Sequence, residues 1–320
     1  MPVTPHSYQA VLDEHRRRLD RLIDRRGVAA VKRIYDQAQA EMVRKITRMA
    51  PRSSQSFTAY QRNLILAQIR QGQALMARRL AGEIGDLSKE AQTEALRGIE
   101  GMLATLEKQY RGTTPVLPTV EASRFAGVVD AKRTSLLVQH NTSVARYGSD
   151  LIGKMENQMS MGLVQNETSG ETIDRIESTA DVSWAGAERI VRTEGAWAMN
   201  GSAADGMAAA REVLPDLEMR WSEHVDVASG APLDRRVAVD SMAMDGQLAI
   251  PGAGVFTMPS TAPRGTLDKP GDVDVPDGLV GRSWAYPPDR PNDRAVCAPW
   301  RSGWGIVGWH YVDGRRVYTR

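Results

Sequence analysis

Apolar residues in the first 50 positions recur at the three- and four-residue spacing of amphipathic helices. The pattern predicts one helix over 7–27 and a second over 28–49, with Gly27 as a natural joint and Pro51 as the stop. The run Arg16-Arg17-Arg18 is expected largely on the face opposite the apolar residues. A third helical region is predicted over 58–110, with a candidate break between Gly82 and Ser88.

Prolines and polar loops divide the middle of the chain. The segment 112–118 combines a glycine with two prolines and predicts a linker. Helices are expected over 130–161, 171–178 and 183–213, and Pro215 ends the last of them.

Beyond Pro215 the helical period disappears. Residues 217–222 alternate as a strand, 251–281 is a loop rich in Pro, Gly and Asp, and Asp313-Gly314 predicts a hairpin within 308–318. The expected fold is mainly α, with long N-terminal helices and a small, loop-rich α+β C-terminal module of short antiparallel strands. The expected domains are 1–112, 113–215 and 216–320, and 113–320 is a candidate for a single domain.

The composition of the 320 residues, 42% hydrophobic and 25% charged, is that of a globular protein. The lone Cys297 excludes an internal disulfide and a Cys-rich zinc site. No signal peptide and no membrane span are predicted, so no membrane partner is expected.

The net charge of +2 conceals a basic N-terminal region. Residues 1–112 carry 20 Lys and Arg against 12 Asp and Glu. Arginine suits phosphate, so this region is a candidate for non-specific contact with double-stranded DNA. The candidate side chains are Arg16, Arg17, Arg18, Arg21, Arg25 and Arg26.

Candidate catalytic and metal residues are scattered. No nucleophile elbow or phosphate-binding glycine loop is present, and Cys297 has no histidine linked to it by a motif. A metal site could draw on His224, Asp226, Asp240, Asp245 and Cys297. Acidic residues in such loops are more often turn formers, so no catalytic residue and no cofactor are predicted.

Five short motifs occur in a recognisable order. They are Arg192-Thr193-Glu194 with Asn200, Arg220-Trp221 with Asp226, Asp245-Gly246-Gln247, Tyr286-Pro287-Pro288-Asp289, and Cys297. In this order the chain resembles the phage Mu F-like head morphogenesis family, the minor capsid proteins encoded beside the portal gene. The resemblance covers about residues 165–300 by motif and the N-terminal helices by character.

The sequence departs from the family pattern at its cysteines. Many members carry one Cys pair after the Trp strand and a second pair near the end, a metal-binding set. This chain has Ser222 to Asp226 at the first place and only Cys297 at the second. The remnant of such a set would be His224, Asp226 and Cys297.

The resemblance implies a structural role without a reaction. The expected protein is a minor component of the virion near the portal, assembled in the host cytoplasm, with portal, capsid and scaffolding proteins as partners and a further contact with packaged or ejected DNA. The resemblance also implies that Arg192 and Glu194 are buried and tie their helix to the Trp221 strand and to the Asp245-Gly246-Gln247 turn. The alternative is a metal-dependent or toxin-like effector enzyme in the C-terminal module.

Overall fold

The fold was analysed in a computed structural model of the whole chain. The structure describes residues 3–49, 58–112, 154, 157–158, 161, 165, 167–233, 237, 239–262, 273–285, 287, 295–313 and 315–319. The predicted linker at 112–118 beyond Gly112 and most of the predicted helix over 130–161 lie outside these residues.

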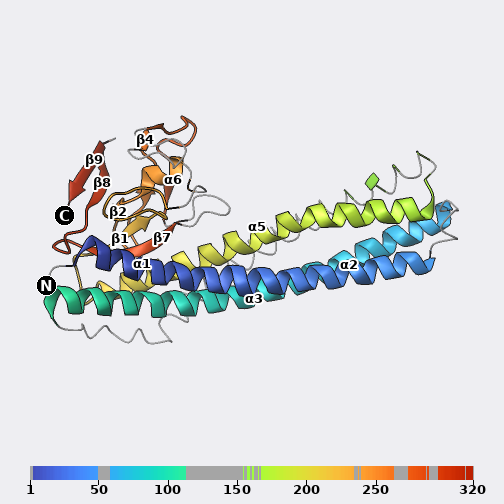
Figure 1. Cartoon of the computed structure of the whole chain (residues 1–320), viewed down its shortest axis with the longest axis horizontal. Coiled ribbons are helices and arrows are strands. Elements are labelled where there is room, and N and C mark those ends of the chain that lie inside the picture. The colour runs from blue at the N-terminus through green and yellow to red at the C-terminus, as the bar shows by residue number, and fades with distance from the viewer. Residues whose placement is uncertain are drawn as a thin grey trace. The chain divides into compact units, whose positions relative to one another are not determined.

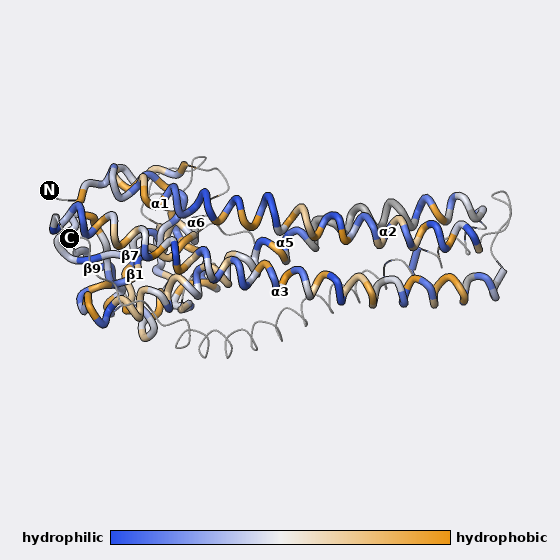
Figure 2. Tube along the Cα trace, turned by 90° about the horizontal axis from the view of Figure 1, so that it is seen from below, coloured by the Kyte–Doolittle hydropathy of each residue, from blue (hydrophilic) through white to orange (hydrophobic). Residues whose placement is uncertain are grey.

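Long helices form most of the described chain before Pro215, as the hydrophobic spacing predicted. α1 (Pro5–Asp20) leads through a π-helical segment, η1 (Arg21–Val28), into α2 (Ala29–Met49). The expected joint at Gly27 is therefore a local widening of the helix rather than a break. α3 (Ala59–Arg111) and α5 (Ser169–Ala210) follow, and Figure 2 shows apolar and polar residues alternating along α3.

Three helix starts share one capping arrangement. Thr4, Thr58 and Thr168 each accept a hydrogen bond from the backbone N–H three residues later, while the side chain at that later position accepts one from the threonine N–H. This reciprocal bonding satisfies backbone groups that would otherwise lack partners at a helix start. The same bonds lower the pKa of the exposed Glu171 carboxyl.

Two predicted helix interruptions are wrong. α3 runs unbroken through Gly82 to Ser88, because Ile84, Leu87 and Ala91 continue its buried face. The segments expected over 171–178 and 183–213 are one helix, α5. Glycine and polar residues weaken a helix only modestly, and tertiary packing overrides that cost.

Short antiparallel strands follow Pro215, confirming the mainly α fold with a small α+β part. The central sheet has the order β2-β1-β7, formed by β1 (Leu217–Ser222), β2 (Leu248–Ala249) and β7 (Val296–Arg301). The hairpin predicted at Asp313-Gly314 joins β8 (Gly308–Val312) to β9 (Arg315–Thr319), and Asp313 has φ of 48°.

Smaller elements fill the loop-rich part between β1 and β7. A short helix, α6 (Val239–Met244), precedes β2. The expected loop over 251–281 carries three two-residue strands, β3 (Phe256–Thr257), β4 (Thr261–Ala262) and β5 (Val273–Asp274). β4 pairs with β5, and β3 pairs with β6 (Ser283–Trp284), just beyond the loop.

The chain divides into two compact units that differ from the predicted domain ranges. The described parts of the first, called the helix-and-sheet unit below, are residues 3–22, 88–112 and the described stretches from Gly195 onward. The second, called the helical unit, contains described residues 23–49, 58–87 and 167–194. Both α1 and β9, at the two ends of the chain, belong to the helix-and-sheet unit (Figure 1).

The core of the helix-and-sheet unit mixes helix and sheet residues. Tyr8 is fully buried and its ring lies 6.3 Å from that of Trp304, also fully buried. Trp221 on β1 meets Phe256 edge to face at 5.3 Å. No helix within the described residues combines the length and the apolar character needed to cross a membrane.

Candidate functional site

The Asp245-Gly246-Gln247 turn interlocks with strand β1. The Gly246 N–H donates to Trp221 O, and the Trp221 N–H donates to Gln247 O, both at 2.9 Å. The Gln247 amide then donates to Thr257 O and accepts from Thr257 N. Gly246 has φ of 83°, where a side chain would be strained, so glycine is required at the centre of the turn.

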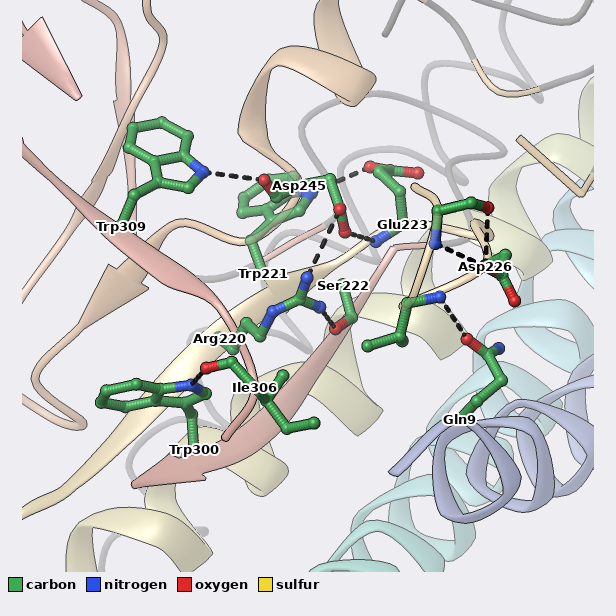
Figure 3. A network of polar contacts seen from close by, with 12 residues as sticks. Gln9, Arg220, Trp221, Ser222, Glu223, Asp226, Asp245, Trp300, Ile306 and Trp309 are labelled. Carbon is green, nitrogen blue, oxygen red and sulfur yellow. Dashed lines mark hydrogen bonds and ion pairs between the residues drawn. The ribbon is translucent and has the colours of Figure 1, made fainter. Parts of the chain in front are cut away.

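The Asp245 carboxylate organises the charged groups behind this turn (Figure 3). It accepts from the Glu223 N–H at 3.1 Å and from Arg220 Nη2 at 3.4 Å. Arg220 Nη1 donates to Ser222 Oγ at 2.6 Å, and the Asp245 backbone carbonyl accepts from Trp309 Nε1 at 2.8 Å. One residue thus connects β1, the turn and the terminal hairpin.

Asn200 connects helix α5 to strand β7. Its side-chain amide donates to Ala295 O at 3.0 Å and accepts from Cys297 N at 2.8 Å. Asn200 is fully buried, and Cys297 lies opposite Trp221 in the sheet. The family-like Asn, Trp and Cys positions are therefore parts of one packed cluster.

Helix α1 contributes to the same cluster. Arg16 Nη2 donates to Ser222 O at 3.2 Å and to Glu223 O, and Tyr8 Oη donates to Pro299 O at 2.9 Å. Burial lowers the pKa of Arg16 and raises the pKa of Tyr8. Next to Tyr8, the Gln9 side chain accepts from Val227 N at 2.8 Å (Figure 3).

A second buried cluster fastens α3 to β7. Glu107 accepts from Arg301 Nη1 at 2.6 Å and from Trp304 Nε1 at 3.1 Å. Arg301 also holds Asp216 through two oxygens. Burial acts to lower the pKa of Arg301, but its hydrogen bonds to Asp216 and Glu107 outweigh that effect and raise it.

The buried carboxylates of both clusters are suited to joining separate elements of the fold through hydrogen bonds. Asp245, Glu223 and Glu107 are all buried, and each accepts a hydrogen bond from an Arg, Trp or backbone N–H. A buried charge is tolerated when it is paired and hydrogen-bonded, and removing its partner is costly. A general base or nucleophile must instead reach a substrate.

The three residues of the remnant metal set, His224, Asp226 and Cys297, lie in different local environments. Asp226 accepts from Ser229 N and Oγ at 2.7 and 2.6 Å, a turn contact that lowers its pKa. The Cys297 thiol is buried and its pKa is raised, which opposes the thiolate that binds zinc. His224 is half-buried. Among the described side chains, no group of three His, Cys, Asp or Glu could hold a metal ion.

In the Arg192-Thr193-Glu194 motif, Arg192 does not make the predicted anchor. Arg192 pairs with Asp24 at 3.0 Å and Glu188 at 2.8 Å, both within the helical unit, and its side chain is about one third exposed. Thr193 Oγ1 donates to its own helix backbone, and Glu194 is buried. The predicted tie from Arg192 to the Trp221 strand is therefore wrong; Asn200 makes the tie from α5 to the sheet.

The expected DNA-contacting arginines divide between two environments. Arg16 is buried and donates to two backbone carbonyls, so its assignment as a DNA contact is wrong. Arg17, Arg18 and Arg21 all pair with Glu14, whose pKa falls through the Arg18 hydrogen bond and the charges of Arg17 and Arg21. Arg25 and Arg26 are exposed.

The fourth motif is only partly described. Pro287 is buried, whereas Tyr286, Pro288 and Asp289 lie outside the described residues, as does the Asp240 side chain.

Sequence reasoning missed Tyr8, Arg16, Glu107 and Arg301 as polar members of the clusters. Arg16 carries a signal that could have been used: it follows Leu12 by four residues and precedes Leu19 by three, so it belongs to the buried face. Glu107 likewise follows the buried Leu103 by four residues. Their partners, about 200 positions away, leave no local signal.

Comparison of the chain with family models, with curated proteins and with solved structures gives no match.

Proposed function

We propose that this protein is a minor structural component of a phage head that acts in head assembly near the portal. The proposal starts from the resemblance carried by the ordered motifs. Its strongest support is the convergence of Asn200, Trp221, Asp245, Gly246 and Cys297 on one buried, interlocked cluster. Motif residues that fasten elements together are expected of an assembly protein.

The candidate enzyme receives less support from the same cluster. A hydrolytic or transfer site needs a carboxylate, thiol or histidine that meets a substrate. Asp245 and Cys297, two motif residues with that chemistry, are buried and held by the fold, and Asp226 accepts its hydrogen bonds from Ser229 in a turn. The structural role therefore accounts for more of the motif than a catalytic role does.

The proposal is tested with procapsids assembled with and without portal protein. Procapsids are produced from portal, capsid and scaffolding genes of the same genome, mixed with purified protein and sedimented. We expect the protein to co-sediment with portal-containing procapsids and to remain in the supernatant with portal-free ones. Equal recovery from both, or absence from both, would contradict a portal-proximal role.

A matched pair of variants links the association to the motif cluster. Asn200→Leu removes both hydrogen bonds to β7, whereas Thr193→Ala removes only a bond within its own helix. We expect Asn200→Leu to reduce co-sedimentation and Thr193→Ala to leave it unchanged. A tryptophan fluorescence spectrum of each variant separates lost folding from lost docking.

A further inference from the structure

Three arginine side chains converge on one carboxylate at the end of helix α1. Glu14 Oε1 lies 3.2 Å from both Arg18 Nε and Arg21 Nη2. Glu14 Oε2 lies 3.3 Å from Arg17 Nη2. Below, Arg17, Arg18 and Arg21 are called the arginine trio. The hydrogen bond from Arg18 is the largest cause of the lowered pKa of the Glu14 carboxyl, and the charges of the arginine trio lower it further.

The helical repeat explains why the arginine trio meets at Glu14. Its members follow Glu14 by three, four and seven residues along α1 and the first residue of η1. At 3.6 residues per turn, all three therefore lie within about 60° of Glu14 around the helix axis. At a rise of about 1.5 Å per residue they span about 6 Å of helix. One small anionic group can thus contact all three guanidinium groups.

The arginine trio carries more charge than Glu14 neutralises. Three guanidinium groups face one carboxylate, and within the described residues Glu14 is the only carboxylate that contacts them. Asp13 lies about 100° away around the helix and pairs with the buried Arg16. Asp20 lies about 120° from Glu14, and Asp24 pairs with an arginine of α5. The excess positive charge of the arginine trio is therefore available to a bound anion.

Solvent reaches both the arginine trio and its carboxylate. The side chains of Arg17, Arg18 and Arg21 are 66%, 37% and 56% exposed, and that of Glu14 is 41% exposed. An exposed ion pair adds little to stability, because water solvates both partners when they separate. Glu14 can therefore turn into solvent at little cost and leave the arginine trio to another anion.

A phosphate group suits the arginine trio better than a second carboxylate does. It offers more anionic oxygens, and guanidinium groups bind it through paired hydrogen bonds. An acidic protein segment would bring only carboxylates, the group that Glu14 already supplies. The DNA backbone instead presents phosphates in series. Arg25, exposed farther along η1, is placed to meet a further phosphate of the same duplex.

We propose that the arginine trio binds phosphate groups of duplex DNA and that Glu14 occupies this site in the free protein as an internal competitor. Binding is an exchange of partners in which phosphate oxygens replace the Glu14 oxygens and the Glu14 carboxylate moves into solvent. No covalent bond forms or breaks. The inference concerns this part of the chain alone and does not depend on the phage-head proposal.

Glu14→Gln provides the sharpest test because it removes the competing charge and keeps the arginine trio. The full chain is titrated into a labelled duplex of about 20 base pairs, two helical turns, by fluorescence anisotropy. We expect Glu14→Gln to bind the duplex about two- to fivefold more tightly than the native chain. Asp20→Asn removes the same charge from the same helix and should change the affinity less. Equal gains in both variants, or no gain in Glu14→Gln, would overturn internal competition.

Removal of the arginine trio tests the site itself. Arg17→Gln/Arg18→Gln/Arg21→Gln should weaken duplex binding about tenfold or more. The slope of the logarithm of affinity against that of salt concentration, measured between about 50 and 200 mM, should fall by at least about 1.

A matched triple variant removes the same net charge elsewhere in the helix-and-sheet unit. Arg97→Gln/Arg282→Gln/Arg315→Gln alters three exposed arginines and should leave the salt slope nearly unchanged. Equal losses in the two triple variants would reduce the effect to net charge and refute the site. Circular dichroism checks that each variant folds, as expected for substitutions at solvent-exposed side chains.

Inorganic phosphate separates the DNA backbone from a free phosphate ion as the ligand. It is added to the native complex at constant ionic strength, with chloride as the control. We expect the duplex to remain bound equally well in both salts, because a single phosphate cannot replace a series of them. Displacement of the duplex by phosphate where chloride has no effect would assign the site to free phosphate and overturn the DNA assignment.

Discussion

His15 is a titratable residue held neutral inside the helix-and-sheet unit. It is buried on α1, and neither ring nitrogen has a hydrogen-bond partner among the described residues. Burial, together with the charges of Arg16 and Arg18, lowers its pKa to about 4 from 6.5. The unfolded chain therefore binds more protons than the folded chain between these values.

The sign of the resulting pH effect follows from this difference in protonation. The free energy of unfolding should decrease as the pH falls from about 6.5 to about 4, by about 3 kcal/mol at 1.36 kcal/mol per pKa unit. Below pH 4 both states are protonated and His15 adds no further change. Urea unfolding followed by tryptophan fluorescence at pH 7, 5.5 and 4 measures the effect.

A His15→Met variant provides the comparison because methionine fills similar space without titrating. The difference between native and variant stabilities should itself change by about 3 kcal/mol over this pH range. A constant difference would show that His15 does not titrate on unfolding in this range. Other titrating groups contribute equally to both proteins.

At the scale of elements, α1 packs against α3 through a glycine. A Cβ added at Gly98 would lie 2.6 Å from His15 Nδ1 and 3.0 Å from Cε1. Gly98→Ala should therefore destabilise the protein by about 1–2 kcal/mol, since the overpacking cost exceeds the gain in helix propensity. Gly101→Ala, with no atom within 4 Å of the new Cβ, should stabilise it by about 0.5–1 kcal/mol.

Combining Gly98→Ala with His15→Ala tests the origin of the effect. Removing the ring should make Gly98→Ala neutral or stabilising, so the two substitutions should be strongly non-additive. Chemical denaturation of the four proteins gives the coupling. Additive effects would mean that the α1–α3 contact at Gly98 does not involve His15.

The elements that the sequence predicted well have strong local signals. Alternation of Leu217, Met219 and Trp221 after Pro215 predicted β1 with its observed bounds, and Asp313-Gly314 predicted the β8–β9 hairpin. The uninterrupted α3 was missed because glycine lowers the local helix propensity, whereas the tertiary packing that stabilises the helix cannot be read from the local sequence. Polar partners such as Arg16 and Ser222 were not predictable, since they are 206 residues apart.

At the scale of the whole molecule, the helix-and-sheet unit is assembled from distant parts of the chain. Strand β7 alone receives Tyr8 from α1, Glu107 from α3 and Asn200 from α5. Separating 113–320 from the rest, as one predicted domain range would do, removes two of these three contacts, and separating 216–320 removes all three. The C-terminal strands should therefore not fold independently of the N-terminal helices.

Deletion of residues 1–22 tests this dependence directly. The deletion removes the buried Tyr8, Leu12 and Leu19 and the Arg16 bonds to β1, so we expect loss of cooperative unfolding in the helix-and-sheet unit. Tryptophan fluorescence is a selective probe because Trp221, Trp300, Trp304 and Trp309 are all buried there. We expect their emission to shift to the red, as for solvent-exposed tryptophan.

A point variant and a fragment show whether the strands require α1 and α3 in order to fold, or whether the deletion only lowers the overall stability. Tyr8→Phe keeps the ring and removes only the hydrogen bond to Pro299, so it should unfold cooperatively with a loss of about 1 kcal/mol. The fragment 113–320 should resemble the deletion, with exposed tryptophans and no cooperative transition. A fragment with buried tryptophans and a cooperative transition would contradict this dependence. It would show that the strands fold without α1 and α3, and that their contacts with Tyr8 and Glu107 form only after the strands have folded.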